Sequence, residues 1–341
     1  MNSSETPPSA SDSSSSTNKE VQNWKEAWNF SPGPRTRKEF QWLALKGICM
    51  GSADIIPGVS GGTIAFITGI YTQWLAAIAS INLIFFKKLL SFELRGALAE
   101  VHVRFLLPLL LGIGVAIVST ARLMHYLITE HGVLTWSLFF GLILASIFVV
   151  GKEIDQWNGS AILFIGLGAL AAFLIVGLIP VSTPESWWFI ILSGIIAICA
   201  MVLPGLSGSF ILLILGKYEF VTGAVKNPFN LENILIILLF ASGCAIGIMG
   251  FSRILKYLLA RYHSATMAIL TGVMIGAMRK VWPWKEVLES KVVRGKIHVL
   301  QEQNIFPPQL DAQVIFAFFL MLIGIVFVLS LEKFSRSSRV S

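Results

Sequence analysis

GSADIIPGVSGGTIAFITGIY, at residues 51–71, breaks a long apolar run with a Pro-Gly step followed by small and hydroxyl-bearing residues. A second stretch, MVLPGLSGSFILLILGKYE at residues 201–219, repeats the same order of residues. The central PGVSGG at 57–62 becomes PGLSGS at 204–209, which gives an offset of 204 − 57 = 147 residues. The repeat predicts a chain built from two related halves, each containing one broken apolar segment.

The repeat continues through the residues that follow each motif. Gly69 and Tyr71 match Gly216 and Tyr218 at the same offset, and Gly112, Arg122, Tyr126 and Gly141 match Gly243, Arg253, Tyr257 and Gly272 at 253 − 122 = 131. Small residues are common in membrane helices, but that abundance does not account for the matched Arg and Tyr. The change in offset predicts a connection 147 − 131 = 16 residues longer in the first half, which we place within 80–103.

The composition excludes an ordinary soluble protein. Of the 341 residues, 55% are hydrophobic and 13% are charged, and the mean hydropathy is +0.75, whereas soluble domains carry about 25% charged residues. The net charge of +7 comes from Lys and Arg clustered in short segments beside apolar runs, a pattern that orients membrane proteins. We therefore expect a membrane protein with no nucleic-acid partner.

The apolar runs predict an all-α polytopic membrane protein with two inverted-topology repeats, each a re-entrant or broken helical hairpin plus three transmembrane helices. Residues 1–35 are polar at their start and are expected to form a disordered cytoplasmic tail. The first repeat covers 36–182, with a hairpin at 42–80 and helices at 104–128, 133–151 and 160–180. The second repeat covers 183–341, with a hairpin at 187–225 and helices at 232–259, 264–280 and 312–332.

The inversion follows from counting membrane crossings. Whether a hairpin re-enters or spans as a pair of helices, each half makes an odd number of crossings, so the halves have opposite orientations, as in many secondary transporters. Arg35, Arg37 and Lys38 precede the first apolar region and predict a cytoplasmic N-terminus. The basic segment 279–310 disagrees, because the count places it outside; we keep the count, since charge bias is only a tendency.

The two breaks predict an anion site inside the membrane. Pro removes a backbone donor, and the first amides of the helix that follows have no intrahelical partner. These amides and the helix dipole favour a negative ligand, commonly phosphate. The alternative is close helix packing through small residues. The candidate phosphate-binding residues are Gly58, Ser60, Gly61, Gly62, Thr63, Gly205, Ser207, Gly208 and Ser209.

Three charged residues join this candidate site. Arg122 and Arg253 are matched by the repeat, and a guanidinium suits a phosphate because it donates two hydrogen bonds in one plane. Their alternative role is snorkelling to the lipid headgroups. Asp54 precedes the first break and has no counterpart, because the offset of 147 leads to Met201. An acid there predicts proton coupling or a charge partner, or simple helix capping.

Both motifs resemble the signature segments of the bacterial polyprenyl-phosphate (undecaprenyl-phosphate) transporter family of the PopT type, formerly a family of unknown function. The resemblance covers about 40–332. It implies a multi-pass translocase of the bacterial plasma membrane that returns undecaprenyl phosphate across the bilayer for reuse in peptidoglycan and surface polymer synthesis. It places these residues at the site: Asp54, Gly58, Ser60, Gly61, Gly62, Thr63, Gly205, Ser207, Gly208 and Ser209. Separately from the resemblance, we expect a proton or sodium ion as a possible coupling ion.

Two other functions remain to be weighed. A lipid phosphatase would need a nucleophile and acid–base histidines in a recognisable pattern, and the sequence offers neither this pattern nor an HExxH metal site. We therefore expect no enzyme activity, no cofactor and no metal. A small-anion channel or exchanger is the alternative, because paired helix N-termini also suit small anions. A lateral opening toward lipid favours the translocase, whereas a cavity fed only from water favours the channel.

Overall fold

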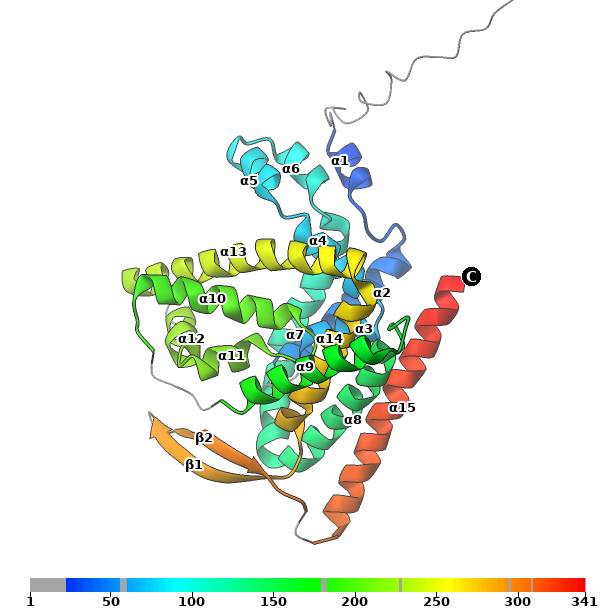
Figure 1. Ribbon diagram of the computed structural model, residues 1–341. Helices are drawn as coiled ribbons and strands as arrows, with labels where there is room; N and C mark the ends of the chain where they lie inside the picture. The colour runs from blue at the N-terminus through cyan, green and yellow to red at the C-terminus, as the bar shows by residue number, and fades with distance from the viewer. Residues whose placement is uncertain are drawn as a thin grey trace, which may run out of the picture.

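The computed structural model describes residues 23–55, 60–178, 183–226, 229–293, 296–307 and 309–340. These residues form helices and a single two-stranded β-hairpin (Figure 1). The first half contains α1 (Trp24–Phe30), α2 (Arg37–Asp54), α3 (Gly61–Ile67), α4 (Tyr71–Ala79), α5 (Leu83–Leu90), α6 (Leu94–Glu100), α7 (Val103–Glu130), α8 (Gly132–Gly151) and α9 (Gly159–Val176). The second half contains α10 (Trp187–Val202), α11 (Gly208–Ile214), α12 (Tyr218–Lys226), α13 (Leu231–Arg261), α14 (His263–Val281), β1 (Lys285–Val293), β2 (Lys296–Asn304) and α15 (Ala312–Val340).

The N-terminal region departs from the expected tail at one point. Residues 1–22 lie outside the described residues, but 24–30 form α1, which packs on α6. The helix α2 then begins with a capping box: the Thr36 hydroxyl accepts from the Glu39 amide, and the Glu39 carboxylate accepts from the Thr36 amide. This reciprocal pair satisfies two amides that the helix itself cannot.

In each broken segment, the helix that follows the break folds back along the helix that precedes it. The Lys46 ammonium in the middle of α2 donates to the Thr68 carbonyl at the end of α3, at 2.9 Å. The helix α3 therefore returns along α2. In the second half, a Cβ on Gly208 would stand 2.7 Å from the Ala197 carbonyl of α10, so α11 returns in the same way. The axes of α11 and α12 differ by 117°.

The first long helix of each half packs on its own hairpin. Helix α7 packs on α2, and α13 packs on α10. Gly47 lies against the Leu109 carbonyl, and Gly194 lies against the Phe240 carbonyl. These contacts match residue by residue, because 194 − 47 = 147 and 240 − 109 = 131. The repeat found in the sequence is thus also a repeat of contacts.

The third long helix of each half packs on the other half. Helix α9 packs on α14, and α15 packs on α8. Gly168 lies against the Ile269 carbonyl, and Gly324 lies against the Leu138 carbonyl. The repeat therefore extends to the last helices at an offset of 324 − 168 = 156, which leaves 156 − 131 = 25 extra residues between α14 and α15. The β-hairpin lies in this interval, and α5 and α6 lie where the 16 extra residues of the first half were expected.

The helices of each close pair run in the same direction. Gly47 of α2 meets Leu109 of α7, and further along, the Ser52 hydroxyl lies 3.3 Å from that of Thr120. On α8 and α15, Gly324 meets Leu138 near one end, and Lys152 pairs with Glu332 at 3.1 Å near the other. Helices α9 and α14 are also parallel, because Gly168 meets Ile269 and, further along, Gly177 meets Arg279. The halves are thus joined by two parallel helix pairs, α8 with α15 and α9 with α14.

Several described helices meet the requirements of membrane spans. Helices α7, α8, α9, α13 and α15 are long and apolar enough, and the bent pair α11–α12 would make a sixth span. These helices give the chain the character of a multi-pass membrane protein. The predicted span at 264–280 is indeed helical, as α14, but it is less apolar than the others. It lies between α8 and α9 with much of its surface buried, so protein rather than lipid surrounds most of it.

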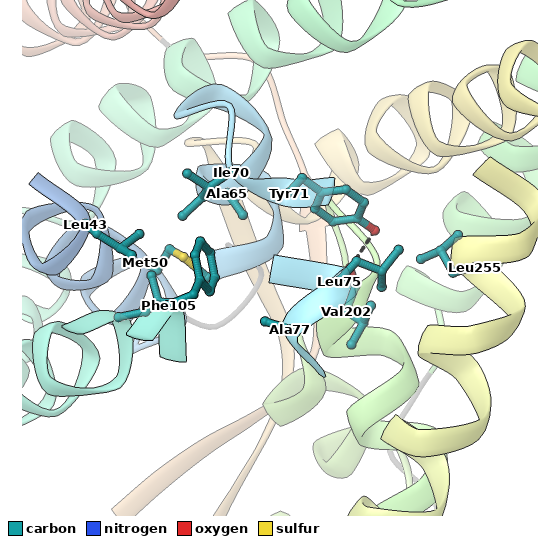
Figure 2. Packing of buried hydrophobic residues seen from close by; sticks show 11 residues of the cluster. Leu43, Met50, Ala65, Ile70, Tyr71, Leu75, Ala77, Phe105, Val202 and Leu255 are labelled. Carbon is teal, nitrogen blue, oxygen red and sulfur yellow. Dashed lines mark hydrogen bonds between the residues drawn. The ribbon is translucent and has the colours of Figure 1, made fainter. Parts of the chain in front are cut away.

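The core joins the two hairpins. Figure 2 shows a cluster in which Leu43 and Met50 of α2 and Phe105 of α7 lie on one side of the first hairpin. Tyr71, at the start of α4, points to the other side, where its hydroxyl donates to the Val202 carbonyl at the end of α10, at 3.1 Å. The buried surface therefore runs continuously from one half to the other.

The β-hairpin is the one described feature that an all-α prediction missed. Strands β1 and β2 pair antiparallel, with Lys285 opposite Asn304 and Val293 opposite Lys296. Its sequence is polar and charged, and no element was predicted between the helices at 264–280 and 312–332. The alternation Ile297-His-Val299 is a weak strand signal, which the surrounding charges obscured.

Candidate functional site

The tips of the two hairpins meet at Ser60. Its hydroxyl lies 3.2 Å from the Leu203 carbonyl and 3.4 Å from the Met201 carbonyl, at the end of α10. It also accepts from the Gly62 amide, at 3.1 Å. The last carbonyls of a helix lack intrahelical partners, so a side chain of the first hairpin satisfies backbone groups of the second. Ser60 is almost completely buried.

Thr63 makes the second connection between the tips. Its hydroxyl accepts from the Gly205 amide at 3.0 Å. Gly205 has φ +89, a conformation that residues with a Cβ rarely adopt. A Cβ on Gly62 would stand 3.1 Å from the Val202 carbonyl. Glycine is therefore needed at one position for the turn and at the other for close approach.

The Asp54 carboxylate caps the tip of the first hairpin. Its Oδ1 accepts from the Gly61 amide at 2.7 Å. The next amides are also bonded, that of Gly62 to the Ser60 hydroxyl and that of Thr63 to the Ser60 carbonyl, at 3.0 Å. The capping role left open by the sequence is the one found here. In this arrangement a residue of the chain supplies the negative charge at this helix start.

The tip of the second hairpin is different. Ser207 precedes α11 but does not cap it; instead its hydroxyl lies 2.8 Å from that of Ser209. Met201 occupies the position that matches Asp54, so the second tip lacks the corresponding acid. Within the described residues, no side chain caps the first amides of α11. The two motifs are similar in sequence but differ in how their amide ends are satisfied.

The structure brings most of the expected site residues together. Those in the two tips are Ser60, Gly61, Gly62, Thr63, Gly205, Ser207, Gly208 and Ser209. Gly58 and the side chain of Arg122 lie outside the described part of the structure. Arg253 is exposed, on a different face of α13 from its buried neighbour Ser252. Among the described contacts, none joins Arg253 to either tip.

Two cavities lie beside the first hairpin. One, of about 510 Å³, lies between α2, α4 and α7, and its lining includes Trp42, Lys46, Gln73 and His102. Burial and the charge of Lys256 lower the pKa of His102. The other, of about 120 Å³, lies where the α3–α4 turn meets α8, α13 and α14, and Tyr71 lines it. Sequence reasoning did not single out His102 or Gln73, because neither belongs to the repeat.

The described residues contain no group of three or more His, Cys, Asp or Glu side chains placed to hold a metal ion.

Comparison with known proteins decides the family. A family model described as undecaprenyl phosphate translocase-like matches residues 50–298. A polyprenyl-phosphate transporter of Vibrio cholerae is 43% identical over 299 residues, which are 86% of this chain and 96% of the relative. A polyprenyl-phosphate transporter of Staphylococcus aureus is 32% identical over 263 residues, 72% of this chain and 88% of the relative.

This chain belongs to the undecaprenyl phosphate translocase-like family. The region matched by the family model begins just before Asp54 and ends within β2, so it includes both hairpin tips but only the last residues of α2. The resemblance predicted from the two motifs is thereby confirmed. No solved structure matches this member of the family.

Proposed function

We propose that the protein is a polyprenyl-phosphate translocase that returns undecaprenyl phosphate across the bacterial plasma membrane for reuse in peptidoglycan and surface polymer synthesis. Membership in the family, two relatives named as transporters and several apolar helices support this function. They also favour transport over catalysis as the role of the buried polar tips.

The observation that carries the proposal is the direct meeting of the two hairpin tips. The Ser60 hydroxyl donates a hydrogen bond to the Leu203 carbonyl, and the Thr63 hydroxyl accepts one from the Gly205 amide. Polar backbone inside a bilayer is tolerated only where protein or a water-filled cavity satisfies it. Here each tip supplies part of that requirement for the other. Separation of the tips would free the Ser60 hydroxyl and the Gly205 amide, and both can donate to an anionic headgroup.

In this proposal the phosphate binds between the tips. The first amides of α11 provide donors that no side chain of the described chain caps, and the hydroxyls of Ser207 and Ser209, which are hydrogen-bonded to each other, provide a further donor. On the other tip, the Gly61 amide binds once Asp54 withdraws, and the amides of Gly62 and Thr63 bind once they leave Ser60. Gly58, Gly205 and Gly208 allow the backbone to approach, and Arg122 and Arg253 attract the headgroup from the ends of their helices.

Asp54 would couple transport to an ion. Its carboxylate occupies the Gly61 amide, where the phosphate would otherwise bind. Two negative groups at one helix start repel each other, so phosphate binding favours protonation of Asp54 or neutralisation by a cation such as sodium. Release of the headgroup would then restore the Asp54–Gly61 bond.

We further propose that the halves are inverted and that the N-terminus is cytoplasmic. The second helix of each half, α8 or α14, runs parallel to the third helix of the other half, α15 or α9. Successive spanning helices within a half cross the bilayer in opposite directions. A parallel pair made from a second helix and a third helix therefore supports opposite orientations of the two halves, which would suit rocking between two access states.

The test is transport by the purified full-length protein in liposomes that carry undecaprenyl phosphate, with headgroup accessibility as the readout. We expect Ser60→Ala and Ser207→Ala to slow transport by about tenfold, because each removes hydrogen bonds at the tips. Ser119→Ala is the control, since Ser119 is exposed on α7 and bonds only within its own helix.

Undiminished transport by both tip variants would overturn the proposed site. Flux of inorganic phosphate through the same liposomes, without movement of the lipid, would favour a small-anion channel instead.

A further inference from the structure

Two lysines share one carboxylate oxygen at the end of α14. Lys280 belongs to the last turn of this helix, Lys285 begins β1, and Glu302 lies on β2. Each ammonium lies 2.7 Å from the same Oε1 of Glu302. Lys285 also donates to the Lys280 carbonyl, at 2.7 Å. The three side chains are 12–27% exposed, so the cluster is mostly covered but keeps some contact with the surface.

The cluster carries more positive than negative charge. Burial opposes ionisation of Glu302, but the charges and hydrogen bonds of the two lysines outweigh it and lower the pKa of this carboxyl. Lys285 does not benefit equally: burial first, and then the like charge of Lys280, lower its pKa to about 8. The environment therefore stabilises the charged form of Glu302 but destabilises that of Lys285, because one carboxylate must serve two ammonium groups. A second negative group would complete the balance.

This cluster borders the second hairpin tip. The Lys280 ammonium lies 4.8 Å from the centre of the Phe210 ring, and Phe210 follows Ser209 directly in the second motif. On the other side, the Lys285 ammonium lies 5.3 Å from the centre of the Trp136 ring on α8. Aromatic faces hold a cation without neutralising it. The lysines are therefore fixed in place but keep their charge for a ligand.

We propose that Lys280 and Lys285 form a capture site for a phosphate monoester headgroup, and that Glu302 is the internal anion which this headgroup displaces. The proposal rests on the function proposed above and adds a first binding step beside the second tip. A doubly charged phosphate attracts two ammonium groups more strongly than one carboxylate does. Glu302 lies on a strand at the edge of the molecule (Figure 1) and can turn to water when displaced.

The site also accounts for the basic segment that disagreed with the crossing count. The β-hairpin lies at the opposite end of the molecule from α1 (Figure 1), so a cytoplasmic N-terminus places it outside. Positive charge is disfavoured in external loops on grounds of topology alone. Binding of an anionic lipid headgroup gives a physical reason for positive charge in this external segment.

The test measures binding of farnesyl phosphate to the full-length protein in nanodiscs, beside farnesol and inorganic phosphate. We expect Lys280→Gln and Lys285→Gln each to weaken binding about tenfold, since each removes a charge-assisted bond. Glu302→Gln should bind as tightly as the wild type or more tightly, because it removes the competing anion. Lys152→Gln and Glu332→Gln, from the ion pair between α8 and α15, are matched controls and should leave binding unchanged.

The sign of the Glu302→Gln effect decides the proposal. If this variant and the lysine variants all weaken binding in step with a lower melting temperature, the cluster is a structural ion pair and the proposal is wrong. If the wild type prefers farnesyl phosphate to farnesol but the lysine variants bind it equally well, the capture site fails and the proposed function stands. If the wild type shows no such preference, the proposed function itself fails. Competition by inorganic phosphate at the same concentration as farnesyl phosphate would overturn the assignment to a lipid headgroup.

Discussion

Gly168 and Gly324 occupy matching places in the two helix pairs that join the halves. Each lies so close to a carbonyl of the partner helix, that of Ile269 or Leu138, that a Cβ would collide with backbone. Backbone cannot move aside as a flexible side chain can. The hydrophobic effect does not drive helices together in lipid, so van der Waals contact at such close packing stabilises the helix pair instead.

We predict that Gly168→Ala destabilises the protein by about 1–3 kcal/mol, the usual cost of overpacking. Gly166 is the control, because it lies on the same helix and a Cβ there meets nothing within 4 Å. Gly166→Ala should leave the melting temperature in detergent unchanged or slightly higher, since Ala favours helix. Equal melting temperatures for the two variants would contradict the close packing of α9 on α14.

Asp54 gives a second prediction at this scale. Asp54→Asn keeps an oxygen that can accept the Gly61 amide but cannot change its charge. We expect the variant to fold with less than about 1 kcal/mol change in stability and to transport without any response to a proton gradient. Asp155→Asn is the control, because this side chain is 71% exposed. A gradient response equal to that of the wild type would exclude Asp54 as the coupling residue.

Single residues differed in how well the sequence predicted them. Ser60 and Gly205 could be found because the repeat marked them, and Thr63 because it follows Ser60-Gly61-Gly62 after the break; all three meet at the tips. The repeat marked Arg253 equally, yet its side chain is exposed on α13. A repeat shows that two positions are equivalent, but it does not show which face of a helix points inward.

At the scale of elements, the β-hairpin and the end of α14 form one unit held by neutral hydrogen bonds as well as by the lysine–glutamate cluster. The Trp282 indole donates to the Ile305 carbonyl at 2.8 Å, and the Asn304 amide group donates to the Arg279 carbonyl at 2.9 Å. These neutral bonds hold the strands in place at any pH near neutrality. The charge of Lys285, in contrast, changes in that range.

We therefore predict that farnesyl phosphate binding weakens as the pH rises from about 7 to about 9. Lys285, with its pKa lowered to about 8, is charged below this range and neutral above it. The groups that face it are Lys280 and Glu302; the carboxyl of Glu302, with its lowered pKa, stays ionised throughout. A phosphate monoester is already almost fully ionised above pH 7, so a change in affinity over this range comes from a group of the protein and not from the ligand. Lys285→Gln should bind weakly at every pH, and a wild-type affinity that does not change over this range would contradict the prediction.

Elements with long apolar runs were predicted from the sequence, whereas short or polar elements were not. The hairpins and long helices follow from Pro-Gly breaks and apolar runs, and the extra residues of the first half were correctly placed within 80–103. The strands were missed because a two-stranded ribbon outside the membrane leaves no long apolar pattern. Helix α1 was missed because its polar surroundings favoured a tail.

At the scale of the whole molecule, the proposed orientation can be tested directly. We predict that Glu286→Cys reacts with a membrane-impermeant maleimide in intact cells, whereas Lys38→Cys reacts only after the membrane is permeabilised. Both positions are exposed in the structure, so a difference reports the side of the membrane. Cys49, Cys199 and Cys244 are replaced by Ser in both proteins. Labelling of Lys38→Cys in intact cells would reverse the proposed topology.

The sequence predicted two related halves, but it did not predict that the last helix of each half, α9 or α15, packs on the other half. We call this arrangement the exchange of the last helices. Two offsets, 147 and 131, emerge from residues of distinctive type such as Arg and Tyr. The third offset depends on Gly168 and Gly324 within runs of Leu, Ile and Phe, where chance matches are frequent. Only the contacts of these glycines with Ile269 and Leu138 reveal it.

The exchange of α9 and α15 sets an order of events during biosynthesis. Helix α9 ends at Val176, and its partner α14 begins at His263, 263 − 176 = 87 residues later. At 5–20 residues per second this interval lasts about 4–17 s, during which the glycine-lined face of α9 has no partner of its own chain. Helix α8 waits longer still, until α15 is made. Ribosome stalling between the halves would therefore leave an inserted but unclosed intermediate, exposed to the machinery that degrades unassembled membrane proteins.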